Sequence, residues 1–167
     1  MACEINAGFD KDCAYSLAGV ERLYLGNHGD FTYNKNSGGT VTGITAVSGA
    51  TFYQYDFNLD SCIGTSDLTI GTNNRRYINQ TVTFSSDVNG QSAVDIMDSL
   101  GLATVDVILV TREGEVELYG EYGGLTSSVG QMSTGGALGD AAGASVTLIG
   151  AAKSYKTFIS SSVSIPV

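Results

Sequence analysis

The chain has 167 residues, among them 22 glycines and one proline, and its formal net charge is −9, with 8 Lys and Arg residues against 17 Asp and Glu. Duplex nucleic acid is held mainly through cationic side chains on its phosphates, so this excess of acidic residues argues against a protein that binds DNA tightly. An acidic surface beside DNA would repel it, which is useful only where DNA must pass without sticking. The length predicts one domain over residues 1–167, and the many Gly, Thr, Val and Tyr residues predict a β-rich fold.

Targeting signals and cysteine spacing indicate the cellular compartment and the state of the thiols. The start, Met-Ala-Cys-Glu-Ile-Asn, has no basic segment before an apolar run, and no stretch approaches ~20 apolar residues. We therefore expect no signal peptide, no membrane anchor and synthesis in the cytoplasm. Cys3, Cys13 and Cys62 are odd in number and lack Cys-x-x-Cys spacing, which favours buried free thiols over a zinc site, with a Cys3–Cys13 bridge as the alternative.

The first fifty residues predict little regular structure. Their composition predicts, in order, an ordered arm, a short strand, a polar loop and a loosely alternating strand, over residues 1–19, 20–25, 26–39 and 40–47. The turn Ser48-Gly49-Ala50 then leads into the next strand, so the two strands are expected to form a hairpin.

The stretch Thr51–Asp60 has the clearest alternation in the chain. One side carries Tyr53, Tyr55, Phe57 and Leu59, and the other carries Gln54, Asp56, Asn58 and Asp60. Side chains alternate across a strand, so we predict a strand with a buried aromatic face and an acidic face turned to solvent or to a channel. The acidic residues, with Asp67, also approach calcium-loop spacing, but Ser61 stands where that loop needs glycine, and we expect no metal.

The middle of the chain predicts two more strands and the only convincing helix, over residues 66–72, 77–86 and 91–100. The helix pattern rests on one apolar face made by Ala93, Val94, Met97 and Leu100. Ser92 with Asp95 resembles a capping box, and Gly101 is expected to end the helix.

The last third predicts a core strand and a second acidic strand. Residues 104–110 are apolar nearly throughout, which is typical of a strand buried on both sides. Beyond a turn at 112–114, residues 115–121 alternate, with Glu115, Glu117 and Glu121 on the side expected to face solvent or a channel. A long glycine-rich loop over 122–143, a strand over 144–149 and a C-terminal tail over 151–167 complete the prediction.

Catalytic and cofactor motifs are weak. His28 is the sole histidine and stands in an expected loop, and no Ser or Cys occupies a strand-to-helix elbow. The glycine-rich segment lacks the Gly-Lys-Ser/Thr of a phosphate loop, and the glutamates of 115–121 have no tryptophan as a sugar platform. We expect no enzyme, no catalytic residue and no cofactor.

Two segments resemble a known family. The first is Cys3–Leu25, with Gly8, Cys13, Gly19-Val20 and Leu23-Tyr24-Leu25; the second runs from Leu118-Tyr119-Gly120-Glu121 through Gly123-Gly124-Leu125, Thr134-Gly135, Gly139-Asp140 and Gly143 to Val146-Thr147-Leu148-Ile149-Gly150. In this placement of glycines and strand ends the chain resembles the tail-tube (major tail) proteins of tailed bacteriophages. The resemblance covers less than half of the chain and departs from the family after Gly150.

The resemblance implies a β-sandwich or half-barrel with one flanking helix, whose strands join those of other copies in an inter-subunit barrel. Such subunits form six-membered rings that stack into a tube, so the expected partners are further copies and other virion tail proteins, with DNA passing unbound, in virions assembled in the host cytoplasm. The loop residues expected at subunit contacts are Tyr122, Leu125, Met132, Leu138 and Asp140, together with residues 26–39. A capsid decoration or head–tail joining protein and a carbohydrate- or cell-binding β-module remain as alternatives.

Overall fold

A computed structural model describes residues 17–135 and 142–167. Strands make up 52% of the described residues, which contain one helix, so the prediction of a mainly β fold with one helix is confirmed. The elements are β1 (Val20–Asn27), β2 (Phe31–Lys35), β3 (Val41–Ala46), β4 (Tyr53–Tyr55), β5 (Ile63–Ile70), β6 (Arg76–Ser86), α1 (Gln91–Leu102), β7 (Thr104–Thr111), β8 (Val116–Tyr119), β9 (Leu125–Ser133), β10 (Gly143–Ala152) and β11 (Thr157–Ile159).

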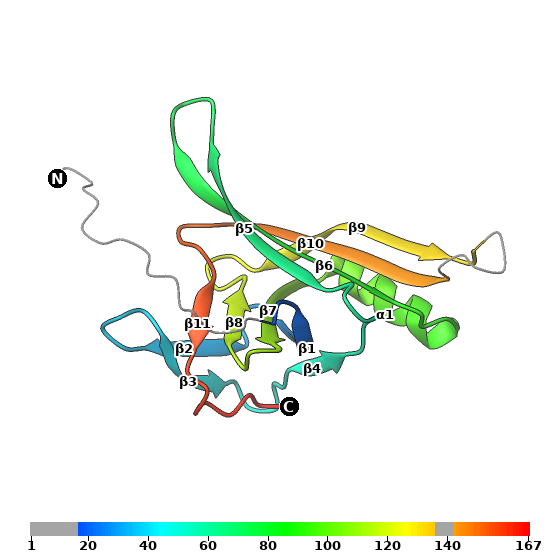
Figure 1. Ribbon diagram of the computed structural model, residues 1–167, viewed down its shortest axis with the longest axis horizontal. Helices are drawn as coiled ribbons and strands as arrows, with labels where there is room; N and C mark the ends of the chain where they lie inside the picture. Colours follow the sequence, from blue (N-terminus) through cyan, green and yellow to red (C-terminus); the bar gives the residue numbers. More distant parts are fainter. Residues whose placement is uncertain (1–16, 136–141) are drawn as a thin grey trace.

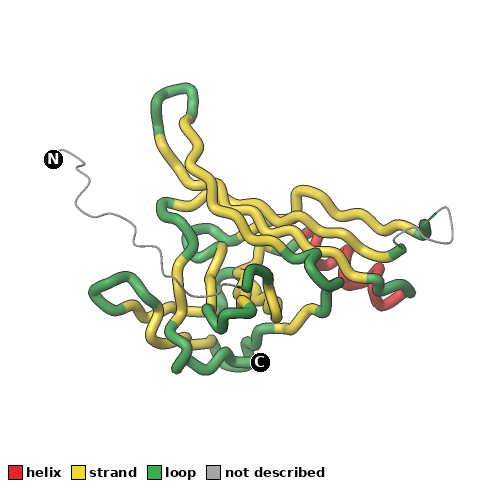
Figure 2. The backbone as a smooth tube through the Cα atoms, viewed as in Figure 1, coloured by secondary structure: helices red, strands yellow, loops and turns green. Residues whose placement is uncertain are grey.

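All the strands belong to one open, mixed sheet that bends back over itself. Its order is β2-β3-β11-β8-β7-β9-β10-β6-β5, with β1 paired to β7 and β4 paired to β1. The pairings are antiparallel except the parallel contact of β11 with β3. Figures 1 and 2 show the long strands β5, β6, β10 and β9 on one side of the molecule and the shorter strands on the other.

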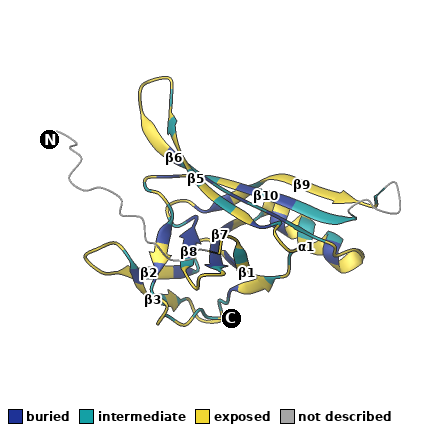
Figure 3. Ribbon diagram, in the orientation of Figure 1, coloured by how far each residue is buried: buried dark blue, intermediate teal, exposed yellow. Residues whose placement is uncertain are grey.

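The strand β7 lies at the centre because both of its faces are apolar. Val107 and Leu109 point into a core shared with β1, β6, β10 and α1, while Ile108 and Val110 point into a second core shared with β2, β3, β11 and the C-terminal residues. Alternate side chains of a strand leave on opposite faces, so a continuous apolar run fills both cores. The prediction of a strand buried on both sides is confirmed, and Figure 3 shows the buried positions concentrated there.

The helix α1 covers the core-facing side of the long strands, with Ala93 and Leu100 buried. Its N-cap is Gly90, at φ +121°, and the backbone N–H groups of Ala93 and Val94 donate to the Gly90 carbonyl. The capping-box prediction is wrong, because the helix starts before Ser92 and no side chain caps it. Gly101 lies inside the helix instead of ending it.

The predicted strand over 51–60 is reduced to the three residues of β4, and β4 pairs with β1 instead of forming a hairpin with β3. Phe52 breaks the expected alternation by stacking on Phe31, with ring centroids 4.0 Å apart, inside the second core. Tyr53 is consequently 63% exposed and Leu59 81% exposed, where burial was expected. Asp60, at φ +60°, marks a turn.

Three segments expected to be irregular contain strands. The polar loop 26–39 contains β2, the loop 122–143 contains β9, and the tail 151–167 contributes the end of β10 and all of β11. β2 pairs with β3 and β9 pairs with β10 as consecutive strands, whereas β11 pairs with β8, far away in the sequence, so that local composition gave no signal for β11.

The C-terminal residues complete the second core. Val163 and Ile165 pack against it, and the backbone N–H of Phe52 donates to the Pro166 carbonyl at 2.7 Å. Deleting residues 161–167 is therefore expected to lower the free energy of unfolding by about 2–3 kcal/mol, from two lost apolar contacts and one lost hydrogen bond. Urea unfolding followed by circular dichroism measures the loss; an unchanged midpoint would contradict this packing role.

Candidate functional site

The most extensive polar surface is one face of the long strands. β5, β6, β10 and β9 lie side by side, with α1 on one side of them (Figure 1). By the strand registers, one set of alternate side chains lies on the side of the core, and the other set lies on the opposite side. We call the second set the bare face. The strand registers place on it Ile63, Thr65, Asp67 and Thr69 of β5; Tyr77, Asn79, Thr81, Thr83 and Ser85 of β6; Ser145, Thr147, Ile149 and Ala151 of β10; and Thr126, Val129, Gln131 and Ser133 of β9.

The chemistry of the bare face is almost uncharged. Within these four strands it carries mainly hydroxyl and amide side chains, one carboxylate at Asp67, no Lys or Arg, and five apolar or aromatic side chains: Ile63, Tyr77, Val129, Ile149 and Ala151. The hydroxyls of Thr83 and Thr147 lie 3.2 Å apart across β6 and β10, which confirms that these strands present the same face. A surface of this kind offers hydrogen bonds to water and no cation for phosphate.

The acidic residues expected on one strand are scattered. Gln54 and Asp56 are exposed on and beside β4, but Asn58 is half-buried, and its side-chain amide donates to Asp87 at 2.8 Å. Asp60 pairs with Arg112 at 2.7 Å. These four side chains form no continuous acidic row, because the strand that would have aligned them ends at Tyr55.

The second predicted acidic row is also divided. Glu115 is exposed at the β7–β8 turn, whereas Glu117 is 7% exposed, so the expectation that Glu117 faces solvent is wrong. Glu117 accepts a hydrogen bond from the Tyr119 hydroxyl at 2.9 Å and forms an ion pair with Lys156. Buried carboxylates require such partners, and β11 with its preceding turn supplies the cation.

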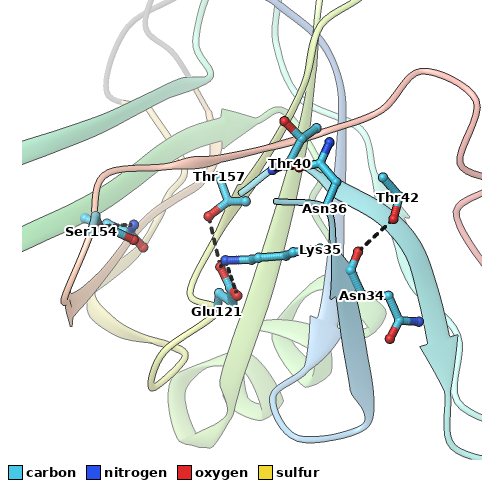
Figure 4. A network of polar contacts seen from close by, with 9 residues as sticks. Asn34, Lys35, Asn36, Thr40, Thr42, Glu121, Ser154 and Thr157 are labelled. Atoms are coloured by element: carbon cyan, nitrogen blue, oxygen red, sulfur yellow. Dashed lines mark hydrogen bonds and ion pairs between the residues drawn. The ribbon is translucent and has the colours of Figure 1, made fainter. Parts of the chain in front are cut away.

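Glu121 follows β8 and belongs to a polar network that joins strands distant in the sequence (Figure 4). The ammonium of Lys35 lies 2.6 and 2.8 Å from its two carboxylate oxygens, and the Thr157 hydroxyl donates to one of them at 2.9 Å. Burial lowers the pKa of Lys35, but the hydrogen bond and charge of Glu121 outweigh it, so the pKa is raised. The network ties β2 to the end of β8 and to β11, which is a structural role.

Asp106 is the most deeply buried charged residue among those described, at 1% exposure in the middle of β7. Its Oδ1 lies 2.7 Å from His28 Nδ1, and its Oδ2 accepts a hydrogen bond from the Tyr33 hydroxyl at 2.7 Å. His28, expected to be a solvated loop residue, is therefore a partner of a core carboxylate. The sequence gave no signal for this contact because the two residues are 78 positions apart.

Burial raises the pKa of Asp106; the hydrogen bonds from Tyr33 and His28 lower it by less, and the charge of Glu121 raises it further. Between the ordinary and the raised pKa the folded state binds more protons than the unfolded state, so this group's contribution to stability grows as the pH falls through the raised pKa. The test compares two variants, His28→Gln alone and His28→Gln with Asp106→Asn, because His28→Gln removes the titration of the imidazole. We expect the variant that keeps Asp106 to gain free energy of unfolding relative to the other as the pH is lowered from 7 to 4.5. Urea unfolding at the two pH values measures it, and a difference that is independent of pH would contradict the raised pKa.

The residues expected at subunit contacts have mixed positions. Tyr122 is 47% exposed, and the Lys35 ammonium lies 5.4 Å from its ring centroid. Met132 is 37% exposed on β9, but Leu125 is fully buried in the first core, so the expectation that Leu125 is available to a neighbour is wrong. Leu138 and Asp140 lie outside the described residues.

The described residues contain no group of three or more His, Cys, Asp or Glu side chains that could hold a metal ion. Cys62 is a free, buried cysteine, and burial raises the pKa of its thiol to about 12; Cys3 and Cys13 lie outside the described part of the chain. No helix in residues 17–135 or 142–167 has the length and apolar character needed to cross a membrane.

The polar groups of the fold thus divide into internal networks that hold strands together and the bare face, which no other element of residues 17–135 and 142–167 covers. Comparisons of the chain with protein-family models, with curated proteins and with solved structures find no match.

Proposed function

We propose that this chain is a virion structural protein that assembles into stacked rings and forms a bacteriophage tail tube, with the bare face lining the channel through which DNA passes. The carrying observation is that a four-stranded surface lacks any Lys or Arg, while the opposite side of the same strands packs much of the first core. DNA that meets hydroxyl, amide and occasional carboxylate groups finds no cation to hold its phosphates.

The open ends of the sheet support the same proposal. β5 and β2 end the strand order, so among the described strands each has an edge without a strand partner. Exposed edges invite pairing with further chains, and a contact between unlike surfaces of identical copies generates closed rings. β9 pairs with β7 only at Leu125 and Thr126, so the rest of that edge of β9 also lacks a strand partner among the described strands. In this proposal the free edges of β5 and β9 in neighbouring copies join, and the long strands close into a tube around the channel. The proposed chain has no catalytic residue and needs no cofactor.

Negative-stain electron microscopy of the purified protein and of virions tests the assembly. We expect rings and tubes in which the protein repeats along the tail, with other tail proteins only at the ends. Monomers alone at high concentration would contradict the proposal, and decoration of a capsid or a single ring at the head–tail junction would favour a different structural role.

A second experiment tests the assignment of the channel wall. Thr81→Arg with Gln131→Arg places two cations on the bare face, and Thr32→Arg with Ser161→Arg adds the same charge at exposed positions outside it. Tubes of the first variant are expected to retain duplex DNA, with binding that weakens steeply as salt is raised. Tubes of the control variant should let DNA pass through the channel as tubes of the parent protein do. Equal retention of DNA by both variants would contradict the assignment of the bare face to the channel wall.

A further inference from the structure

A groove opens beside α1 on the core-facing side of the long strands. It encloses about 480 Å³ between α1, β4, β6 and β10, and its wall is mainly apolar. Tyr53, Ile96 and Val88 line it while remaining 63%, 47% and 47% exposed. Large apolar side chains gathered in one concave site mark a surface that a partner covers.

The hairpin of β5 and β6 extends beyond the body of the domain (Figure 1). Leu68 and Ile70 are 51% and 58% exposed on the side of β5 that continues the core-facing side of the sheet, because no other element of the described chain reaches that far. Residues 71–75 close the hairpin, with the Gly71 N–H donating to the Arg75 carbonyl at 2.8 Å. The hairpin is therefore a narrow, ordered arm with apolar side chains near its tip.

The charges of the arm and of the groove are opposite. Arg75 and Arg76 stand at the hairpin tip, and neither has an ion-pair partner among the described residues. Asp56 lines the groove, whose lining includes no Lys or Arg, and Asp87 stands at its rim between Ser86 and Val88, where it accepts a hydrogen bond from the Asn58 amide. Opposite charges placed around apolar contacts fix the orientation of a docking partner.

The arm cannot reach the groove of its own chain. β6 starts at Arg76 beside the hairpin tip and ends at Phe84 and Ser86, which line the groove, so donor and acceptor lie at opposite ends of one strand. Ten strand residues separate their ends by roughly 33 Å. A contact between two different surfaces of identical chains repeats from copy to copy.

We propose that the β5–β6 hairpin of one copy docks into the α1–β4 groove of a second copy, with Leu68 and Ile70 in the apolar wall and Arg75 and Arg76 facing Asp56 and Asp87. The inference rests on the proposed self-assembly and names the contact through which copies join. Since the hairpin and the groove belong to different ends of the sheet, each chain gives one arm and accepts one.

Mixed cysteine variants test the contact directly. In a background with Cys3→Ser and Cys13→Ser, one chain carries Ile70→Cys and a second, differently sized chain carries Ile96→Cys. Mixing the two under mild oxidation is expected to give a covalent heterodimer on a denaturing gel, with little product from either chain alone. Absence of the heterodimer while the mixture still associates by sedimentation would overturn the inference, as would equal cross-linking of each variant to itself.

Charge exchange gives an independent readout. Arg75→Asp with Arg76→Asp, and separately Asp56→Arg with Asp87→Arg, are each expected to weaken self-association by about 30-fold. Their mixture should recover most of that loss, because the arm of each variant is again opposite in charge to the groove of the other. Thr32→Asp, at an exposed position of β2 outside the arm and the groove lining, is the control and should change association less than about threefold.

The two proposals fail in different ways. If the parent protein forms no assembly, the proposed tube fails and this contact fails with it. If the parent assembles and neither the arm nor the groove variants weaken it, only the contact is wrong, and a different occupant, such as a small apolar molecule, fills the groove. Circular dichroism and thermal unfolding of every variant keep loss of folding apart from loss of docking.

Discussion

Asp106→Ala is expected to lower the free energy of unfolding by about 2–4 kcal/mol, because it removes the acceptor of a hydrogen-bond network in the core. The carboxylate is 1% exposed and takes the Tyr33 hydroxyl and the His28 ring as partners, each at 2.7 Å. Truncation leaves the buried tyrosine hydroxyl without an acceptor and opens a small cavity in β7. Urea unfolding at pH 7 measures the effect.

Two controls separate this network from a general loss of negative charge. Asp106→Asn keeps an acceptor for Tyr33 and should recover more than half of the lost stability. Asp67→Ala removes an exposed carboxylate from the bare face and should change stability by no more than about 0.5 kcal/mol. If Asp106→Ala and Asp67→Ala had similar effects, the buried network would not be a stabilising element.

Gly64→Ala is expected to cost about 2–3 kcal/mol through overpacking. A Cβ atom at this position of β5 would lie 2.6 Å from Leu109 Cδ1 and 2.7 Å from the Tyr119 hydroxyl oxygen. These atoms come from β7 and β8, so the glycine marks where the long strands approach the central strands most closely. Both neighbours are at most 1% exposed and have no free space to move into.

A double-mutant cycle tests that explanation. Leu109→Ala alone is expected to cost about 2–5 kcal/mol, but in combination with Gly64→Ala the total should fall short of the sum by about 1 kcal/mol or more, because the added methyl group occupies vacated space. Gly101→Ala is the matched control: nothing lies within 4 Å of its added Cβ, and it sits inside α1. That change should stabilise the protein by about 0.5–1 kcal/mol; strict additivity at Gly64 and Leu109 would contradict close packing there.

Elements dominated by local pattern were predictable from the sequence. The strands β1, β6 and β7 and the helix α1 lie where periodicity placed them, because a continuous apolar run or an amphipathic face dictates burial without reference to a distant partner. The strand over 51–60 was wrong for the opposite reason: its alternation is real, but the stacking of Phe52 on Phe31 fixes the chain differently, and that contact joins residues 21 positions apart.

The candidate site shows the same division. The alternation of Asn79, Thr81 and Thr83 is visible in the sequence. We nevertheless searched the sequence for rows of carboxylates, and the bare face is distinguished instead by having no Lys or Arg. The pairings of β9 with β10 and of Asp106 with His28 depend on the folded arrangement, and no local pattern encodes them. Leu125 was assigned to a loop for this reason, although it is completely enclosed.

The position of β7 between both cores has a consequence for how the molecule comes apart. Neither half of the domain can lose its order while the other keeps a complete interior, because Leu109 serves one side and Ile108 the other on adjacent residues. The backbone amides of this strand should thus exchange with heavy water only when the whole domain opens, whereas those of the protruding hairpin exchange by local fraying. A subunit built in this way can leave its arm free to adapt to a neighbour and still unfold in a single cooperative step.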